Sequence, residues 1–190
     1  MTQAVHATLA GHPDNPPVFM QDIGATLLQK SDGSLAIAYA IHGPTDGLRI
    51  PAPDAPAPAE ALWRTTCCEL FVGTTDAADY REFNFSPSGQ WAVYDFSDYR
   101  DRTPAQPRIS TPSIRSGQHA DRLRLDALLP PTALPKMSNE GGILCFALAV
   151  VLESNDGSLG YWALAHPAGK PDFHHRAGFA LQLDSPEFGA

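Results

Sequence analysis

The chain of 190 residues has a length suited to one domain, and we expect a single domain over residues 1–190. Hydrophobic residues make up 43% of it, and no apolar run approaches the ~20 residues of a membrane-spanning helix, so we expect no membrane partner. The formal net charge is −8 and no cluster of Lys or Arg occurs, which excludes the usual nucleic-acid-binding surface.

The first third of the chain predicts strands joined by turns. Residues 1–10 alternate weakly between apolar and polar side chains, which predicts an edge strand. Residues 23–29 and 34–42 flank a turn at 30–33 that ends in glycine, so we expect a β-hairpin there. Residues 43–61 are rich in proline, which has no N–H for a strand ladder, and they predict an extended loop.

The middle of the chain predicts three consecutive strands, at residues 66–73, 80–86 and 90–96. The first is rich in β-branched and aromatic residues, and the second alternates in the way a half-buried strand does. The turn Ser-Pro-Ser-Gly at 86–89 joins the last two, so we expect an antiparallel pair.

The last part of the chain predicts further strands after an irregular stretch at 98–112. Three prolines within 128–139 leave room for only a short helical turn, and 166–178 predicts a long loop. The expected strands lie at 109–115, 122–127, 143–153, 158–165 and 179–183. About ten or more short strands with scarcely any helical periodicity predict an all-β fold, a jelly-roll-like antiparallel β-sandwich.

Polar side chains occur inside the central strands, where aromatic residues also gather. Glu69, Glu82 and Asn84 are examples, and buried acids are rare unless they are paired, so some of these groups must face solvent, a partner or a ligand. Trp63 precedes Glu69 by six residues, and this even spacing places both side chains on one side of an extended strand.

A tryptophan beside a carboxylate is suited to binding a sugar. The indole covers the apolar C–H face of the ring, and the carboxylate accepts hydrogen bonds from the hydroxyls. Trp63 lies where the proline-rich loop meets a strand, a place that is more often exposed than buried. We therefore expect a saccharide or a related small polar metabolite as the ligand.

Some of these residues are also of the types found in catalytic and metal-binding sites. Glu69 and Glu82 have the residue types of a glycosidase pair, but the sequence does not give the carboxyl spacing that this reaction needs. The segment 166–175 holds three histidines and Asp172, which are metal-ligand types, although adjacent histidines diverge in an extended segment. No loop has the ligand spacing of a calcium site, and the familiar catalytic motifs are absent. We expect no catalytic residue and no metal ligand, with structural calcium left as an alternative.

The cysteines and the start of the chain bear on the cellular compartment. Cys67 and Cys68 are adjacent, and neighbouring strand positions point to opposite faces, so they do not readily bridge each other. We expect reduced thiols packed in the core. The first residues lack the basic and apolar regions of a signal peptide, so we expect a cytoplasmic location.

Three runs of the sequence together resemble a known family. LWRTTCCELFVG, YREFNFSPSGQWAVYDF and YWALAHPAGKPDFHHRAGFALQL, which lie between residues 62 and 183, resemble the DOMON-like proteins related to type 9 carbohydrate-binding modules. The resemblance implies an antiparallel β-sandwich and a non-catalytic ligand-binding role. In the type 9 modules the ligand is a sugar held between aromatic rings by charged and amide groups.

The resemblance carries over to particular residues. It makes Trp63 one aromatic platform and Glu69 a hydrogen-bonding acid, and it leaves the second platform open among the remaining tryptophans, Phe173 and His174. The predicted ligand-binding residues are Trp63, Glu69, Glu82, Asn84, Trp91, Trp162, Asp172 and His174.

Two alternatives to saccharide binding stay open. Related DOMON domains bind haem through Met and His, but Met1, Met20 and Met137 are the only methionines here and none lies inside a clearly predicted strand. The second alternative is an interaction domain without a small ligand, whose exposed aromatic residues contact another protein.

Overall fold

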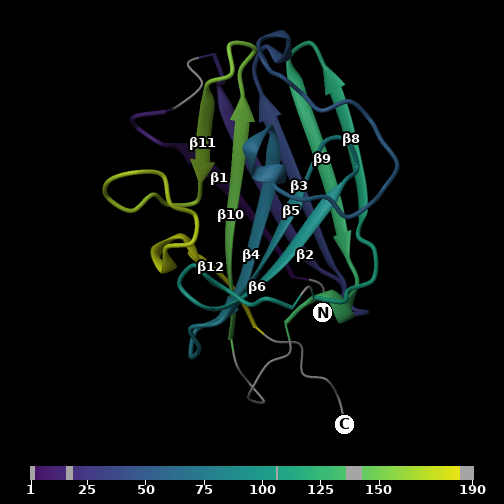
Figure 1. Ribbon diagram of the computed structural model, residues 1–190, viewed down its shortest axis with the longest axis vertical. Coiled ribbons are helices and arrows are strands. Elements are labelled where there is room, and N and C mark those ends of the chain that lie inside the picture. The colour runs from purple at the N-terminus through teal and green to yellow at the C-terminus, as the bar shows by residue number, and fades with distance from the viewer. Residues whose placement is uncertain (1–2, 16–18, 106, 136–142, 185–190) are drawn as a thin grey trace.

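The computed structural model describes residues 3–15, 19–105, 107–135 and 143–184, which form an all-β structure (Figure 1). All of its named strands pair in antiparallel fashion, which confirms the predicted fold class. In chain order the strands are β1 (Gln3–Gly11), β2 (Asp22–Gln29), β3 (Leu35–His42), β4 (Cys67–Thr74), β5 (Tyr80–Phe85), β6 (Trp91–Asp98), β7 (Asp101–Arg102), β8 (Ser113–His119), β9 (Arg122–Leu129), β10 (Ile143–Glu153), β11 (Leu159–Ala163) and β12 (Leu181–Asp184).

The helical segments in this part of the chain are short 3-10 turns. They are η1 (Thr45–Gly47), η2 (Leu62–Arg64), η3 (Pro131–Ala133) and η4 (Arg176–Gly178). Within the described ranges, therefore, no helix has the length and apolar character needed to cross a membrane.

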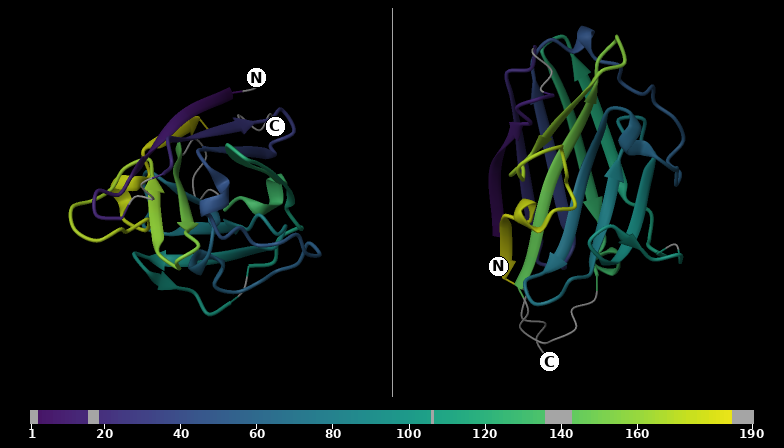
Figure 2. Two further views of the ribbon diagram at one scale, coloured as in Figure 1. Left: turned by 90° about the horizontal axis from the view of Figure 1, so that it is seen from above. Right: turned by 60° about the vertical axis from the view of Figure 1, so that its left-hand side comes forward.

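The strands form two layers, which Figure 2 shows from two further sides. Sheet A has the order β1-β2-β3-β9-β8, and sheet B has the order β7-β6-β5-β4-β10-β11, with β12 also paired to β10. The two layers are joined at β1, which pairs with β2 along most of its length and with β11 through Ala10 and Gly11. Over residues 3–9, β1 pairs with β2 alone, as expected of an edge strand, and only its end at Ala10 and Gly11 passes to the other sheet.

The main core lies between the inner faces of the two sheets. In β3, buried and half-buried residues alternate, as the sequence predicts for a strand with one face on a core. In β4 and in β10 beyond Ile143, every residue is buried, so both faces of sheet B are covered here. A second apolar cluster, which includes Leu62, Phe71, Tyr80 and Phe179, packs on the outer face of sheet B beneath the loops.

The expected elements agree with the observed strands best where alternation or a turn residue defined them. The strand β10 has the expected bounds, and Gly33 adopts φ +79° in the turn between β2 and β3. By contrast, β8 begins at Ser113 rather than at residue 109, and β7 lies in a stretch that was expected to be irregular.

The proline-rich loop pairs more than expected. Trp91 bonds with the loop through two alanines, donating its N–H to Ala57 O (3.1 Å) and accepting from Ala59 N (2.8 Å). Pro58 lies between these alanines and needs no donor, so a segment dense in proline can still run alongside β6.

Candidate functional site

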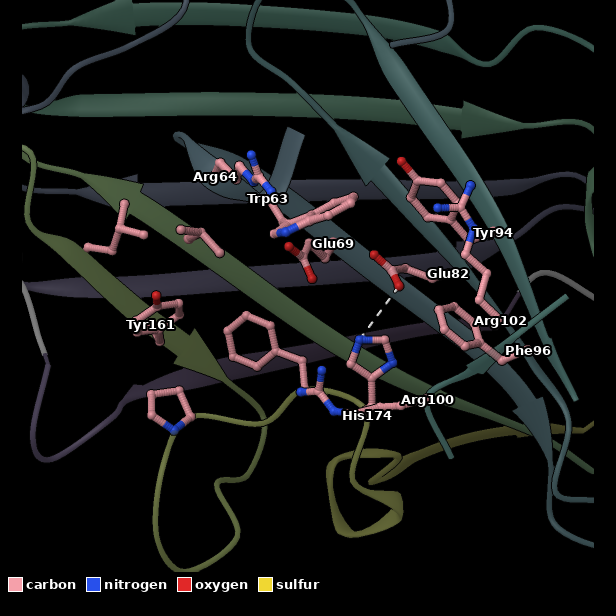
Figure 3. Close-up of a pocket in the computed structure, with 14 residues that line it drawn as sticks. Trp63, Arg64, Glu69, Glu82, Tyr94, Phe96, Arg100, Arg102, Tyr161 and His174 are labelled. Carbon is pink, nitrogen blue, oxygen red and sulfur yellow. Dashed lines mark ion pairs between the residues drawn. The ribbon is translucent and has the colours of Figure 1, made fainter. Parts of the chain in front are cut away.

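A cavity of about 530 Å³ opens on the outer face of sheet B (Figure 3). Its floor crosses neighbouring strands, with Glu82 on β5, Glu69 on β4 and Val151 on β10. The floor therefore has an acidic part and an apolar part. Aromatic side chains stand along its sides, and three arginines line it as well.

One wall is built around Trp63. This residue lies on η2, which packs against β4 and leaves Trp63 37% exposed. Its ring meets Tyr94 of β6 edge-on, with centroids 5.7 Å apart. The structure brings Trp63 and Glu69 to one cavity, but not through the strand spacing expected from the sequence. Residues 62–64 form a 3-10 turn, and β4 begins only at Cys67.

The opposite side of the cavity is lined by Tyr161 and Phe173. Tyr161 comes from β11 and Phe173 from the loop that follows it, and their ring centroids are 6.0 Å apart. Among the expected second platforms, Phe173 and His174 line the cavity. Tyr94 and Tyr161 are additional lining residues that the sequence-based site does not contain.

The remaining two tryptophans lie elsewhere. Trp91 and Trp162 are 7% and 8% exposed and belong to the core between the sheets, on the face of sheet B opposite to Glu69. The structure therefore excludes both from the cavity, and with them the expectation that either one serves as the second platform. Strand alternation explains this placement, because Trp91 and Tyr94 differ by an odd number of positions on β6.

Two carboxyl groups form the acidic part of the floor. Glu69 and Glu82 are 3% and 5% exposed, and Glu82 Oε1 accepts a hydrogen bond from Asn84 Nδ2 at 2.5 Å. Burial and the neighbouring Glu82 raise the pKa of Glu69 well above its usual value. Burial raises the pKa of Glu82 to about 7, although the Asn84 amide and nearby arginines oppose the shift. Asn84 thus lies beneath the floor, where it orients an acid.

A hydrogen-bonded chain orients His174 beside these acids. The Arg100 N–H donates to Tyr80 Oη at 3.1 Å, and Tyr80 Oη lies 2.8 Å from His174 Nδ1. Since the phenol oxygen already accepts from Arg100, its proton is free to go to Nδ1, and the imidazole proton then resides on Nε2. His174 Nε2 lies 3.8 Å from Glu82 Oε2. Burial, with Arg100 nearby, lowers the pKa of His174 to about 4, so the ring is neutral at pH 7.

Asp172 supports the cavity from outside rather than lining it. It accepts hydrogen bonds from Tyr99 Oη at 2.6 Å and from Arg100 Nη2 at 2.7 Å. Burial alone would raise the pKa of Asp172, but these hydrogen bonds outweigh it, and the pKa is lower than usual. The carboxylate also accepts from the backbone N–H of His174, so it fixes the loop that carries Phe173 and His174.

Unfavourable backbone conformations flank the cavity. Among the described residues, Ala61 (φ +58°) and Arg100 (φ +55°) are the non-glycine residues with positive φ. Ala61 precedes the turn that carries Trp63, and Arg100 lines the cavity itself. Such conformations cost on the order of 1 kcal/mol each and concentrate at functional sites.

The residues considered for metal or haem do not converge. His166 Nε2 contacts Ala10 O at 2.8 Å, and His175 caps η4. In the part of the chain that the structure describes, no group of three or more His, Cys, Asp or Glu side chains is arranged to hold a metal ion. Met20 is buried in the main core, and Met1 and Met137 lie outside the described residues.

The buried cysteines do not offer a nucleophile. Cys67 and Cys68 are 0% and 1% exposed, and burial raises the pKa of both thiols. Both thiols therefore stay protonated at neutral pH and pack as small apolar side chains.

Comparison with known proteins gives a similarity in fold. No protein-family model and no curated protein matches the sequence. Among solved structures, the chain is similar to a provisionally assigned carbohydrate-binding protein from Bacteroides uniformis. That match has a TM-score of 0.66 and 14% identity and covers 95% of this chain and 85% of that one.

Two further structures are of family 9 carbohydrate-binding modules from Caldicellulosiruptor kristjanssonii. The complex with glucose matches at 13% identity with a TM-score of 0.47, covering 85% of this chain and 76% of that one. The complex with cellotriose matches at 14% identity with a TM-score of 0.45, covering 85% and 75%. These two TM-scores are too low to carry an inference, whereas the first similarity shows a shared fold. The relation to DOMON-like proteins stays a prediction.

Proposed function

We propose that this protein binds a saccharide in the cavity on sheet B and does not transform it. The observation that carries the proposal is that Trp63, a residue 37% exposed, lines a cavity whose floor holds Glu69 and Glu82. The ring covers the apolar face of a sugar, and the carboxyl groups bind its hydroxyls. Phe173, which also lines the cavity, supplies the second aromatic surface.

The form of the cavity favours a small ligand over a protein partner. Its volume and its mixture of aromatic walls with a few polar groups are typical of sites for small molecules. A docking surface for another protein is instead a continuous exposed apolar patch. The fold shared with a provisionally assigned carbohydrate-binding protein supports the same proposal.

We also propose a reducing, cytoplasmic location. Cys67, Cys68 and Cys145 are all free and buried, and this is typical of proteins that fold where thiols stay reduced. Mass spectrometry of the protein from its native cells tests this location. When the protein is unfolded in the presence of a thiol-blocking reagent, all three cysteines should carry the modification.

Titration calorimetry with a panel of neutral mono- and disaccharides tests the proposed function. At least one sugar should bind, and Trp63→Ala should lower its affinity tenfold or more, which corresponds to about 1.4 kcal/mol. Ile143→Ala is the matched control, because Ile143 is equally exposed at 37% but lies at the start of β10, outside the cavity. If no sugar binds to the folded protein, or if both variants behave alike, the proposal is wrong.

Turnover is tested separately, because Glu69 and Glu82 have the residue types of a hydrolytic pair. Chromogenic glycosides incubated with the protein should release no product beyond the rate seen with Glu82→Gln. Release that depends on Glu82 would replace binding with catalysis as the function of the cavity.

A further inference from the structure

The floor of the cavity brings two buried acids close together, and a cation is the partner that favours the ionised form of both. On the outer face of sheet B, Glu69 pairs across the strands with Asn84, and Glu82 lies two positions before Asn84 on β5. Side chains on such a diagonal start about 7–8 Å apart, within reach of one small group between them. Figure 3 shows both carboxyl groups directed into the cavity.

The two acids differ in their partners. Glu82 accepts from Asn84 Nδ2 and faces the Nε2 of His174 at 3.8 Å. The side chain of Glu69 lines the cavity, and no side-chain hydrogen bond within the described residues contributes to its pKa, so its carboxyl group is open to a donor from the ligand. Ionising an acid in this poorly solvated place is costly, so its natural complement is a positively charged donor brought by the ligand.

The arginines around the cavity do not supply that partner. The Arg100 guanidinium donates to Asp172 at 2.7 Å. Arg102 lies 3.9 Å over the ring of Tyr94 and 3.8 Å from Glu60. Arg64 is exposed on η2. Among the ion pairs of the described residues, none joins an arginine to Glu69 or Glu82.

We propose that the preferred ligand is a saccharide bearing a primary amine, whose ammonium group binds between Glu69 and Glu82. This inference rests on the proposed function, because Trp63 must still hold the sugar ring. An ammonium group has three donors and one positive charge, and it satisfies both carboxylates at once. A hydroxyl in the same place brings no charge, and an anionic group is repelled.

Titration calorimetry at pH 7 with matched sugars tests the preference. The ligands are glucose, glucoses with a primary amine at C2, C3 or C6, N-acetylglucosamine and glucuronate. At least one amine should bind ten or more times as tightly as glucose. N-acetylglucosamine, which lacks the charge, should lose that gain, and glucuronate should bind more weakly than glucose.

Substitutions locate the effect at the two acids. Glu69→Gln is nearly isosteric and removes the charge, so it should weaken amine binding more than glucose binding and reduce the ratio of the two affinities at least fivefold. Glu82→Gln should do the same, so the test does not depend on the folding of one variant. Circular dichroism and thermal unfolding confirm that each variant is folded.

The outcomes separate this inference from the proposed function. Binding of glucose without a preference for any amine, or a preference that both variants keep, overturns the inference and leaves saccharide binding intact. Absence of binding by every sugar to the folded wild-type protein overturns both.

Discussion

At the scale of single residues, the cavity depends on acids and an imidazole whose protonation is set by burial. Glu69 and Glu82 are held close together away from water, and burial raises the pKa of each. The pKa of His174 is lowered instead, because burial and the nearby Arg100 disfavour its charged form. At neutral pH the floor therefore presents an uncharged ring beside two acids that retain protons more readily than exposed ones do.

The protonation of His174 is open to direct measurement. Because Tyr80 donates to Nδ1, we expect the neutral tautomer with its proton on Nε2, and ¹⁵N NMR distinguishes the two ring nitrogens. With a pKa of about 4, the ring should remain neutral at pH 5.5, where an ordinary histidine is mostly charged. Tyr80→Phe removes the donor and should weaken this tautomer preference. A wild-type ring protonated at Nδ1, or a midpoint near 6.5, would contradict the proposed hydrogen-bonded chain.

At the scale of elements, the loop after β11 forms one side of the cavity, and side-chain hydrogen bonds anchor it. In Figure 1 this loop, coloured yellow-green, projects beside β11 before the chain reaches β12. Arg176 in η4 ties its end to sheet B, donating to Thr74 O at 2.5 Å and to Ala77 O at 3.0 Å. Its guanidinium also lies 4.7 Å from the centroid of the Phe179 ring.

Loss of the Arg176 side chain should weaken saccharide binding, although Arg176 does not line the cavity. Arg176→Ala removes both hydrogen bonds, so we expect saccharide affinity to fall several-fold and stability to fall by about 1 kcal/mol. Hydrogen exchange should show lost protection over residues 171–180, with β10 unchanged. Arg176→Lys retains a donor and is the control. Unaltered exchange in the loop together with weakened binding would mean that Arg176 acts by some other route.

The same elements show what the sequence could and could not predict. Alternation placed Glu82 and Asn84 on one face of β5, and it would also have placed Tyr94 there, because Tyr94 pairs with Glu82 across the strands. The spacing of Trp63 and Glu69 did not predict the local structure, since η2 interrupts the extended chain. Which loop folds over sheet B is a long-range property, so the place of Phe173 could not be derived from local pattern.

At the scale of the whole molecule, the sandwich is a rigid support with one sheet covered by loops and the other not. In β2 and β3 of sheet A, core-facing residues alternate with less buried ones, and this pattern made these two strands predictable. Sheet B is buried on both faces at β4 and β10, where the sequence shows nearly continuous apolar character. The single domain over residues 1–190 stays a prediction.

The pH dependence of global stability reports on the buried acids. The folded-state pKa of Glu82, about 7, exceeds its unfolded value near 4.5. Between these two pH values the folded state therefore binds more protons than the unfolded state. The stabilisation that Glu82 gives to the folded state is therefore fully present below about pH 4.5 and is lost as the pH rises towards 7. His174 has the opposite sign, because its folded pKa of about 4 lies below 6.5, so its contribution is lost as the pH falls.

Glu82→Gln separates these two effects. The variant cannot ionise, so we expect it to be more stable than wild type by roughly 1–3 kcal/mol at pH 8, with the difference shrinking towards pH 4.5. Glu69, Arg100, Arg102 and His174 face the same group and are retained in both proteins. Urea unfolding at several pH values measures the difference in stability. If the variant were more stable by the same amount at every pH, ionisation of Glu82 would not be what destabilises the wild-type protein.

The central claim is that a saccharide binds on the outer face of sheet B, and chemical-shift mapping by ¹H–¹⁵N NMR tests it most directly. With the tightest sugar from the panel, the largest changes should fall on the indole N–H of Trp63 and on the amides of Glu69, Phe173 and His174. The account predicts little change on the outer face of sheet A, where a second hollow lies over β2, β3 and β9. Changes confined to that hollow, or spread over the core indoles of Trp91 and Trp162 with Trp63 unaffected, would contradict the account.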